Sequence, residues 1–157
     1  MESPKQVSKL ALNLIERGEW PAINSITLQN GKFWHVRLIR ETTLVSAAYC
    51  YDEDTLENIY HNSKTYFSSF GKNGSFYFKN FEAFCGEGSY GGDGLVGLIY
   101  EGEFLWMAFF DESNPFEHVS MDESFVYAEN NHKQIWRFNI HDPTQITISK
   151  SSLFSLK

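Results

Sequence analysis

Hydrophobic residues near the N-terminus recur with a helical period. The apolar positions are spaced by three and four residues: Val7, Leu10, Ala11, Leu14 and Ile15. This spacing is typical of a helix with one buried face. Ser3 and Gln6 form a capping pair around Pro4, and Gly18 is a stop signal. We therefore predict a helix over residues 4–17 whose apolar stripe packs on a sheet.

The most hydrophobic stretch lies in the middle of the chain and has the period of a strand. Two apolar runs, residues 95–100 and 104–110, are separated by the short turn sequence EGE. In the second run, alternation predicts one face with Phe104, Trp106, Ala108 and Phe110, and another with Leu105, Met107 and Phe109. A strand that is apolar on both faces is covered on both sides. We therefore place this hairpin at the centre of a sheet.

Weaker patterns predict the other elements. Strands are expected over residues 25–28, 33–40, 43–51, 75–79, 125–128, 134–140 and 146–148. Asn30-Gly31 and Asn73-Gly74 predict tight turns. Asp52-Glu53-Asp54 is expected to end the sheet, and Asp54 with Glu57 predicts a capping box for a helix over residues 55–69. Residues 86–94 and 111–123 are interpreted as loops.

Tight turns dominate this pattern, and no alternation of long helices with strands appears. We therefore predict a single α+β domain over residues 1–157. Its sheet is expected to be mostly antiparallel, with a packed N-terminal helix and one further short helix.

Charge is unevenly distributed along the chain. The formal net charge is −7, which disfavours a nucleic-acid partner because phosphate recognition needs Lys and Arg. No Lys or Arg occurs between Lys79 and Lys133, whereas the first 50 residues are slightly basic. The span between these lysines carries Glu82, Glu87, Asp93, Glu101, Glu103, Asp111, Glu112, Glu117, Asp122, Glu123 and Glu129. Two interpretations stay open: a solvated acidic surface, or a docking face for a basic partner.

The two cysteines, Cys50 and Cys85, lie in no CxxC motif and have no His at zinc-ligand spacing. We expect both to be buried, reduced thiols. The N-terminal residues are too charged for a signal peptide, and no apolar run approaches the roughly 20 residues of a membrane span. These observations favour a cytoplasmic protein without a membrane partner.

Catalytic motifs are absent or out of context. Residues 86–91 match GxGxxG, but a strand is expected to follow where the nucleotide-binding motif needs a helix. A metal site built from Asp111, Glu112, Glu117 and His118 would match no known loop spacing. We therefore predict no catalytic residues, no metal and no cofactor. The alternative is a small cytoplasmic enzyme with a pocket roofed by the 86–94 loop.

Aromatic residues in the acidic loops predict a protein-binding surface instead. Tyr90 and Phe116 are expected to act as anchors inside a rim of carboxylates. The predicted partner-binding set is Tyr90, Asp93, Asp111, Glu112, Phe116, Glu117, Asp122 and Glu123. We expect the two loops that carry them to lie on one side of the molecule.

Small, acidic, aromatic-rich chains of this kind resemble bacterial immunity proteins, the cognate inhibitors encoded beside polymorphic or contact-dependent growth inhibition toxins. The resemblance is carried by GGDG at residues 91–94, by the hairpin with Trp106, and by AFFDESNPF at residues 108–116. It implies a cytoplasmic protein that binds one toxin domain, often a basic nuclease, and blocks its active site. The family has no catalytic residues to carry over.

Overall fold

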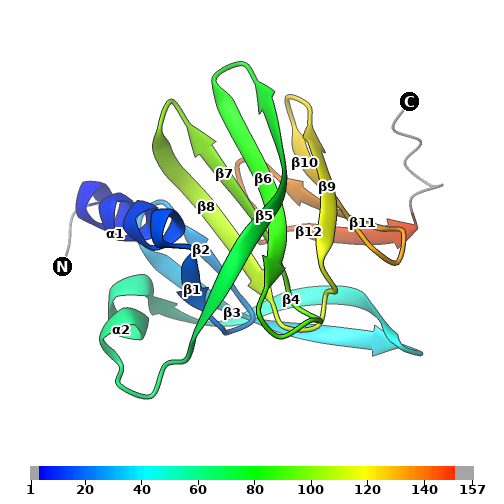
Figure 1. Cartoon of the computed structure of the whole chain (residues 1–157), viewed down its shortest axis with the longest axis horizontal. Coiled ribbons are helices and arrows are strands. Elements are labelled where there is room, and N and C mark those ends of the chain that lie inside the picture. Colours follow the sequence, from blue (N-terminus) through cyan, green and yellow to red (C-terminus); the bar gives the residue numbers. More distant parts are fainter. Residues whose placement is uncertain (1–3, 151–157) are drawn as a thin grey trace.

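The computed structural model describes the backbone of residues 4–150 and the side chains from Lys9 onward. Figure 1 shows the arrangement of its elements. In chain order they are α1 (Pro4–Arg17), β1 (Glu19–Pro21), β2 (Ser25–Leu28), β3 (Lys32–Glu41), β4 (Leu44–Thr55), α2 (Leu56–His61), β5 (Phe67–Phe78), β6 (Phe81–Gly88), β7 (Gly94–Tyr100), β8 (Glu103–Phe110), β9 (Phe116–Met121), β10 (Phe125–Asn130), β11 (Gln134–Asn139) and β12 (Ile146–Lys150). The predicted cap at Ser3 lies outside the described residues.

The strands form two sheets that pack face to face. The large sheet has the order β1-β5-β6-β7-β8-β2-β3-β4, and the small sheet has the order β12-β11-β10-β9. Every strand pair in the described chain is antiparallel, which confirms the prediction of a mostly antiparallel α+β fold. The sequence predicts one sheet, but the strands form two sheets with a hydrophobic core between them. The largest buried members of this inter-sheet core are Trp106, Phe110, Phe116, Trp136 and Phe138.

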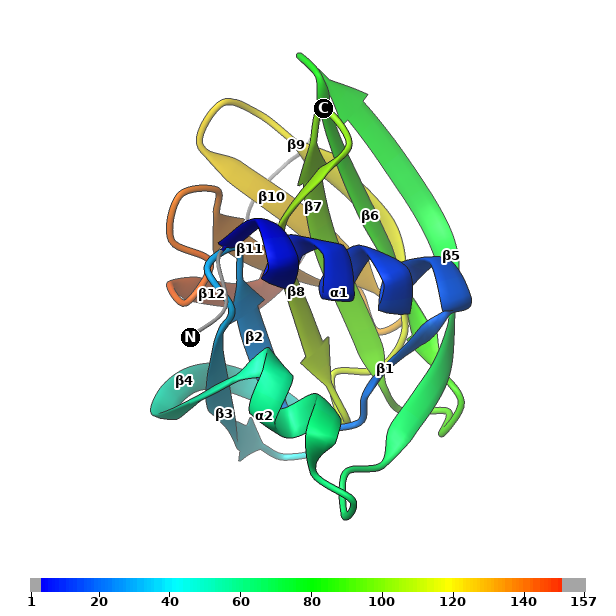
Figure 2. The same cartoon turned by 90° about the vertical axis from the view of Figure 1, so that its left-hand side faces the viewer.

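The two helices cover the opposite face of the large sheet. Figure 2 shows α1 lying across the central strands, with α2 beside it. Leu14 of α1 is fully buried in a helix-side core that also contains Phe104 and Phe109 of β8. The predicted packing of the N-terminal helix on the central hairpin is therefore confirmed. Trp20, just after the helix, packs against Phe104 with ring centroids 6.2 Å apart.

The hairpin of β7 and β8 occupies the middle of the large sheet, as predicted. One detail of the predicted alternation is wrong, because a β-bulge interrupts β8. Leu98 pairs with Trp106 but Ile99 pairs with Phe104, so Leu105 is the extra residue. A bulge shifts the side-chain alternation by one position. Phe104 therefore faces the helices, whereas Trp106 faces the small sheet.

The second helix is shorter than predicted. It ends at His61, and residues 67–70 belong to β5 instead. Its N-cap is Thr55, whose hydroxyl accepts a hydrogen bond of 3.1 Å from the Asn58 amide. The acidic residues 52–54 do not end the sheet, because β4 continues through them to Thr55.

Two segments interpreted as turns or loops are strands. Asn73-Gly74 is not a tight turn, since β5 runs through it with a register shift between Lys72 and Gly74. Residues 111–123 contain β9, an edge strand of the small sheet. The connection predicted over residues 86–94 begins three residues later, at Ser89, because β6 extends to Gly88. No helix in the described part of the chain is long and apolar enough to cross a membrane.

Candidate protein-binding surface

Two connections meet at one end of the large sheet: residues 89–93 between β6 and β7, and residues 111–115 between β8 and β9. We call residues 87–94 and 111–117 the paired-loop end. The amide of Asn114 donates a hydrogen bond of 2.7 Å to the Gly92 carbonyl, which ties the two connections together. Their contact is close, since a Cβ added at Gly94 would lie 2.5 Å from the Asn114 carbonyl oxygen. The predicted proximity of these two segments is therefore observed at this end.

Tyr90 is available to a partner at this end, whereas Phe116 is not. The Tyr90 side chain is 66% exposed in the first connection. Phe116 is fully buried and packs edge-on against Trp136, with ring centroids 5.4 Å apart. The prediction of Phe116 as a surface anchor is wrong, because β9 turns its first side chain into the inter-sheet core.

Asp93 is also a structural residue rather than a surface carboxylate. Its side chain is 1% exposed, and its Oδ1 accepts a hydrogen bond of 3.0 Å from the Gly88 amide. Its Oδ2 has no hydrogen-bond partner among the described residues. Burial raises the pKa of Asp93, although the backbone hydrogen bonds oppose that rise. The predicted partner contact at Asp93 is therefore replaced by a role in holding the loop.

Three carboxylates of the predicted set remain exposed at the paired-loop end: Asp111, Glu112 and Glu117. Glu112 forms an ion pair with Arg40 of β3. The backbone amide of Asp111 is held by Asn24, whose Oδ1 accepts a 2.6 Å hydrogen bond from it. These contacts fix the backbone of the second connection while leaving the Asp111 side chain in solvent.

Sequence reasoning missed two residues that organise this surface. The side-chain amide of Asn73 donates to Glu87 Oε1 at 3.1 Å and to the Phe116 carbonyl at 3.0 Å. Glu87 therefore lies beside the start of β9, where Glu117 follows Phe116. The sequence predicts a turn at Asn73-Gly74, and it is the register shift within β5 that places Asn73 against β9. Glu87 belongs to the acidic span of the sequence, but its spacing alone gives no sign that it lies beside β9.

Asp122 and Glu123 lie at the other end of the molecule, in the turn between β9 and β10. Glu123 pairs with Lys79 of the β5–β6 turn. Asp122 Oδ1 accepts hydrogen bonds of 2.8 Å from the amides of Ser124 and Phe125. Partial burial would raise the pKa of Asp122, but these hydrogen bonds and one from the Tyr127 hydroxyl outweigh it and lower the pKa. The prediction that both acids share a face with Asp111 is therefore wrong, because β9 separates them.

The described residues contain no group of three or more His, Cys, Asp and Glu side chains that converges on a metal-sized site. Asp111, Glu112, Glu117 and His118 do not form one. A cleft of about 670 Å³ lies between the two sheets, and no residue of the 86–94 loop lines it. We call it the inter-sheet cleft.

Comparison with known proteins finds no matching family model, curated protein or solved structure. The functional interpretation therefore depends on the geometry and charge of this chain alone.

Proposed function

We propose that this chain is an immunity-type inhibitory protein that binds a cognate bacterial toxin, a basic nuclease domain, and covers its active site. In this proposal the protein acts in the cytoplasm of the cell that carries the toxin gene. The contact is made by the paired-loop end, with Tyr90 as its exposed anchor. Asp111, Glu112 and Glu117 supply the negative field, and Glu87 lies beside them.

The observation that carries the proposal is the combination of rigid backbone and unneutralised charge at this end. Both connections are fixed by the hydrogen bonds from Asn114 and to Asn24, so the partner would meet a preformed surface. Among the described residues, neither Asp111 nor Glu117 forms an ion pair. A preformed acidic surface binds with little ordering cost and attracts a basic partner from a distance.

The mechanism is occlusion by charge and by an aromatic contact. Carboxylates at the paired-loop end would take the positions that substrate phosphates occupy in a nuclease cleft. Long-range attraction raises the association rate, and burial of the Tyr90 ring slows dissociation. Arg40, paired with Glu112, limits the negative field on the side facing β3.

The proposal predicts a toxin-like reading frame directly upstream of this gene, and it is tested by measuring binding to the purified domain that such a frame encodes. We expect Asp111→Lys with Glu117→Lys to slow association by roughly 10-fold or more at low salt and to reduce its salt dependence. The matched control is Glu101→Lys with Glu103→Lys, an equal charge change at two exposed residues, one in the β7–β8 turn and one at the start of β8, at the other end of the molecule. Tyr90→Ala should speed dissociation while leaving the association rate nearly unchanged.

Growth protection provides the cellular measurement. Cells that express the toxin should lose protection with the Asp111 and Glu117 double variant and keep it with the control. If the double variant binds and protects as the wild type does, the paired-loop end is not the contact surface. The partner would then dock elsewhere, and the slightly basic region around Lys32, Arg37 and Arg40 would be tested next.

The alternative, a small enzyme with a pocket under the 86–94 loop, has less support. Asp93, the buried acid of that loop, is occupied as an acceptor for Gly88, and the inter-sheet cleft lies away from the loop. No specific observation on the described residues favours it.

A further inference from the structure

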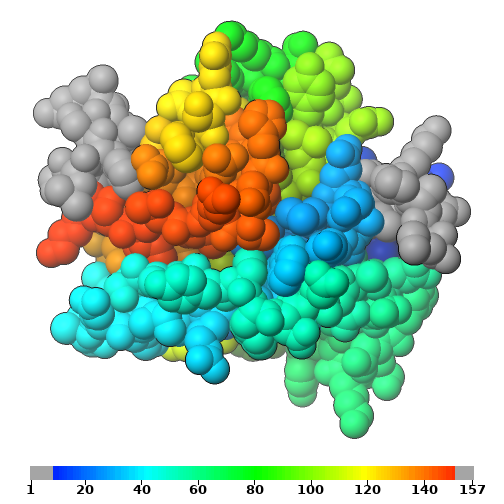
Figure 3. Space-filling view, turned by 180° about the vertical axis from the view of Figure 1, so that it is seen from behind, coloured from blue at the N-terminus to red at the C-terminus, as the bar shows by residue number. Residues whose placement is uncertain are grey.

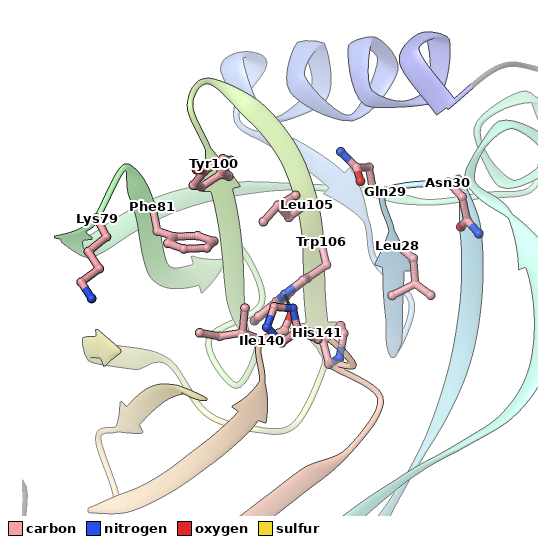
Figure 4. A pocket seen from close by; sticks show the side chains of 11 residues that line it. Leu28, Gln29, Asn30, Lys79, Phe81, Tyr100, Leu105, Trp106, Ile140 and His141 are labelled. Atoms are coloured by element: carbon pink, nitrogen blue, oxygen red, sulfur yellow. Dashed lines mark hydrogen bonds between the residues drawn. The ribbon is translucent and has the colours of Figure 1, made fainter. Parts of the chain in front are cut away.

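The inter-sheet cleft opens at the end of the molecule opposite the paired-loop end. Figure 4 shows the side chains that line it, and Figure 3 shows the back surface, where the segments of β2, β7–β8 and β11–β12 come close together. The lining comes from four separate connections and strands: Leu28, Gln29, Asn30, Lys79, Phe81, Tyr100, Leu105, Trp106, Ile140, His141 and Pro143. The cleft is thus built from tertiary contacts and not from one flexible loop.

The bulge in β8 explains why an apolar surface remains open here. Because Leu105 is the extra residue, both Leu105 and Trp106 contribute to the inter-sheet side. Trp106 forms a buried floor, while Leu105 and Phe81 pack against the same core and stay only half-buried. The Phe81 ring packs at a tilt against the Tyr100 ring, with ring centroids 4.6 Å apart, and together they form one wall.

The polar groups of the cleft favour an anion. None of the described lining residues is Asp or Glu, although the whole chain carries 20 acidic and 13 basic residues. Lys79 is the one lysine or arginine among the described lining residues, and His141 lies at the same opening. The partner of Lys79 is Glu123, and the two side chains are 64% and 72% exposed. Such an exposed ion pair is weak, so a ligand anion can replace Glu123 at little cost.

We propose that the inter-sheet cleft binds a small amphipathic monoanion, with its apolar body against Trp106, Phe81 and Leu105 and its anionic group at Lys79. A volume of about 670 Å³ falls within the range of small-molecule sites, which are mostly apolar with a few placed polar groups. At roughly 30 Å³ per water, the space equals about 20 water molecules, which is ample for a chain of eight carbon atoms with a carboxylate.

The indole N–H of Trp106, at the floor of the cleft, provides an NMR signal that reports binding. Trp106 Nε1 donates a hydrogen bond of 3.1 Å to the Ile140 carbonyl, so its indole N–H signal is sensitive to any molecule that packs on the floor. Trp20 is buried on the helix side of the large sheet and provides a reference indole in the same spectrum. Titration of the ¹⁵N-labelled protein with octanoate should shift the Trp106 signal in a saturable manner and leave Trp20 unchanged.

Lys79→Asn tests the charged contribution to binding, and Leu105→Asp tests the apolar contribution. Lys79→Asn should weaken octanoate binding by up to about 5-fold, the factor that corresponds to about 1 kcal/mol for one exposed charge pair. It should leave the binding of 1-octanol unchanged. The matched control is Lys133→Asn, because both lysines have positive φ (47° and 65°) in exposed turns and Asn tolerates that conformation. Lys133 does not line the cleft, so its replacement should affect neither probe.

Leu105→Asp places a carboxylate in the apolar wall and should abolish the response to both probes, with native folding checked by the dispersion of the remaining signals. Absence of a saturable Trp106 shift with octanoate in the wild-type protein would overturn the proposal. Equal affinity for octanoate and 1-octanol, or equal effects of the two lysine variants, would overturn the anion preference. Because the cleft and the paired-loop end are separate, octanoate binding and toxin binding can fail independently.

Discussion

The indole of Trp106 donates its N–H to the backbone oxygen of Ile140 at a distance of 3.1 Å. Trp106 belongs to β8 at the centre of the large sheet, and Ile140 follows the last residue of β11 in the small sheet. The two residues are 2% and 5% exposed, so the hydrogen bond is shielded from water. It joins the two sheets at the floor of the inter-sheet cleft.

We expect Trp106→Phe to lower the free energy of unfolding more than Trp20→Phe does. Both tryptophans are buried, but Trp20 Nε1 has no hydrogen-bond partner among the described residues. The difference between the variants isolates the bond to Ile140, which should contribute about 0.5–1.5 kcal/mol net. Since 1 kcal/mol shifts the melting temperature by roughly 2–4 °C in a chain of this size, thermal unfolding should resolve it. Equal melting temperatures would contradict a stabilising role for this bond.

Gly97→Ala should destabilise the centre of the large sheet. Gly97 pairs with Phe84 across β6 and β7, and an added Cβ would lie 2.2 Å from the Phe84 ring. Overpacking of a filled core costs about 1–3 kcal/mol, which urea unfolding measures directly. Gly71→Ala is the control, because no atom lies within 4 Å of a Cβ added there. If a second change, Phe84→Leu, does not recover part of the loss, the clash with the ring is not its cause.

Asp93→Asn should stabilise the protein at pH 7. Burial raises the pKa of Asp93 above its ordinary value of 3.8. Ionisation of this acid is therefore less favourable in the folded state than in the unfolded state, and the free energy of unfolding falls as the pH rises through the folded pKa. Asn is uncharged and keeps an oxygen acceptor for the Gly88 amide. The gain should be present at pH 7 and disappear below pH 3.8, where the wild-type carboxyl is protonated in both states.

The control for this substitution is Asp93→Ala, which removes the acceptor and should destabilise at both pH values. Because Asp93 is buried, Asp93→Asn should also leave binding to the proposed toxin partner unchanged. Lower stability of Asp93→Asn at pH 7 would show that the ionised carboxylate is favoured by its surroundings.

Both cysteines should react slowly with a thiol reagent in the native protein. Burial raises the pKa of Cys85 to about 12 and that of Cys50 to about 11, with smaller contributions from the charges of Glu117 and Asp142. The thiolate is the reactive form, so at pH 8 about one Cys50 in a thousand is reactive. Unfolding in urea should make both react quickly. The expected burial is confirmed for Cys85, whereas Cys50 is only half-buried. Rapid labelling of Cys85 in the folded protein would contradict its burial.

The same raised pKa values predict a loss of stability in alkali. Their contribution is complete below the ordinary thiol pKa of 9.0 and declines as the pH rises toward the folded values of about 11 and about 12. Urea unfolding at pH 8 and above pH 9 measures this decline, and Cys85→Ala should reduce its slope.

Local patterns in the sequence were sufficient to predict the elements that depend on neighbouring residues. The period of Leu10, Leu14 and Ile15 predicted α1, and the doubly apolar hairpin predicted the centre of the large sheet. Both signals are strong because burial on one face or on two faces appears directly in residue spacing. The antiparallel arrangement followed from the short turns.

Burial at single positions was decided by contacts between residues far apart in the chain. Phe116 and Tyr90 look alike in the sequence, as aromatic residues among acids and glycines. One lies against Trp136 in the inter-sheet core and the other lies in solvent. The difference arises because β9 is an edge strand of a second sheet. Residues 111–123 show no regular alternation of apolar and polar positions that would predict this strand.

For the candidate surface too, some properties follow from the sequence and others only from the structure. The sequence by itself determined that residues 80–132 carry acids without a compensating Lys or Arg, because charge is a property of composition. Only the tertiary structure decided which of these acids share a surface. A six-residue strand, β9, carries the chain from Glu117 at the paired-loop end to Asp122 and Glu123, and Glu123 pairs with Lys79 of the β5–β6 turn. Acids that are close in sequence are therefore separated by the length of a strand.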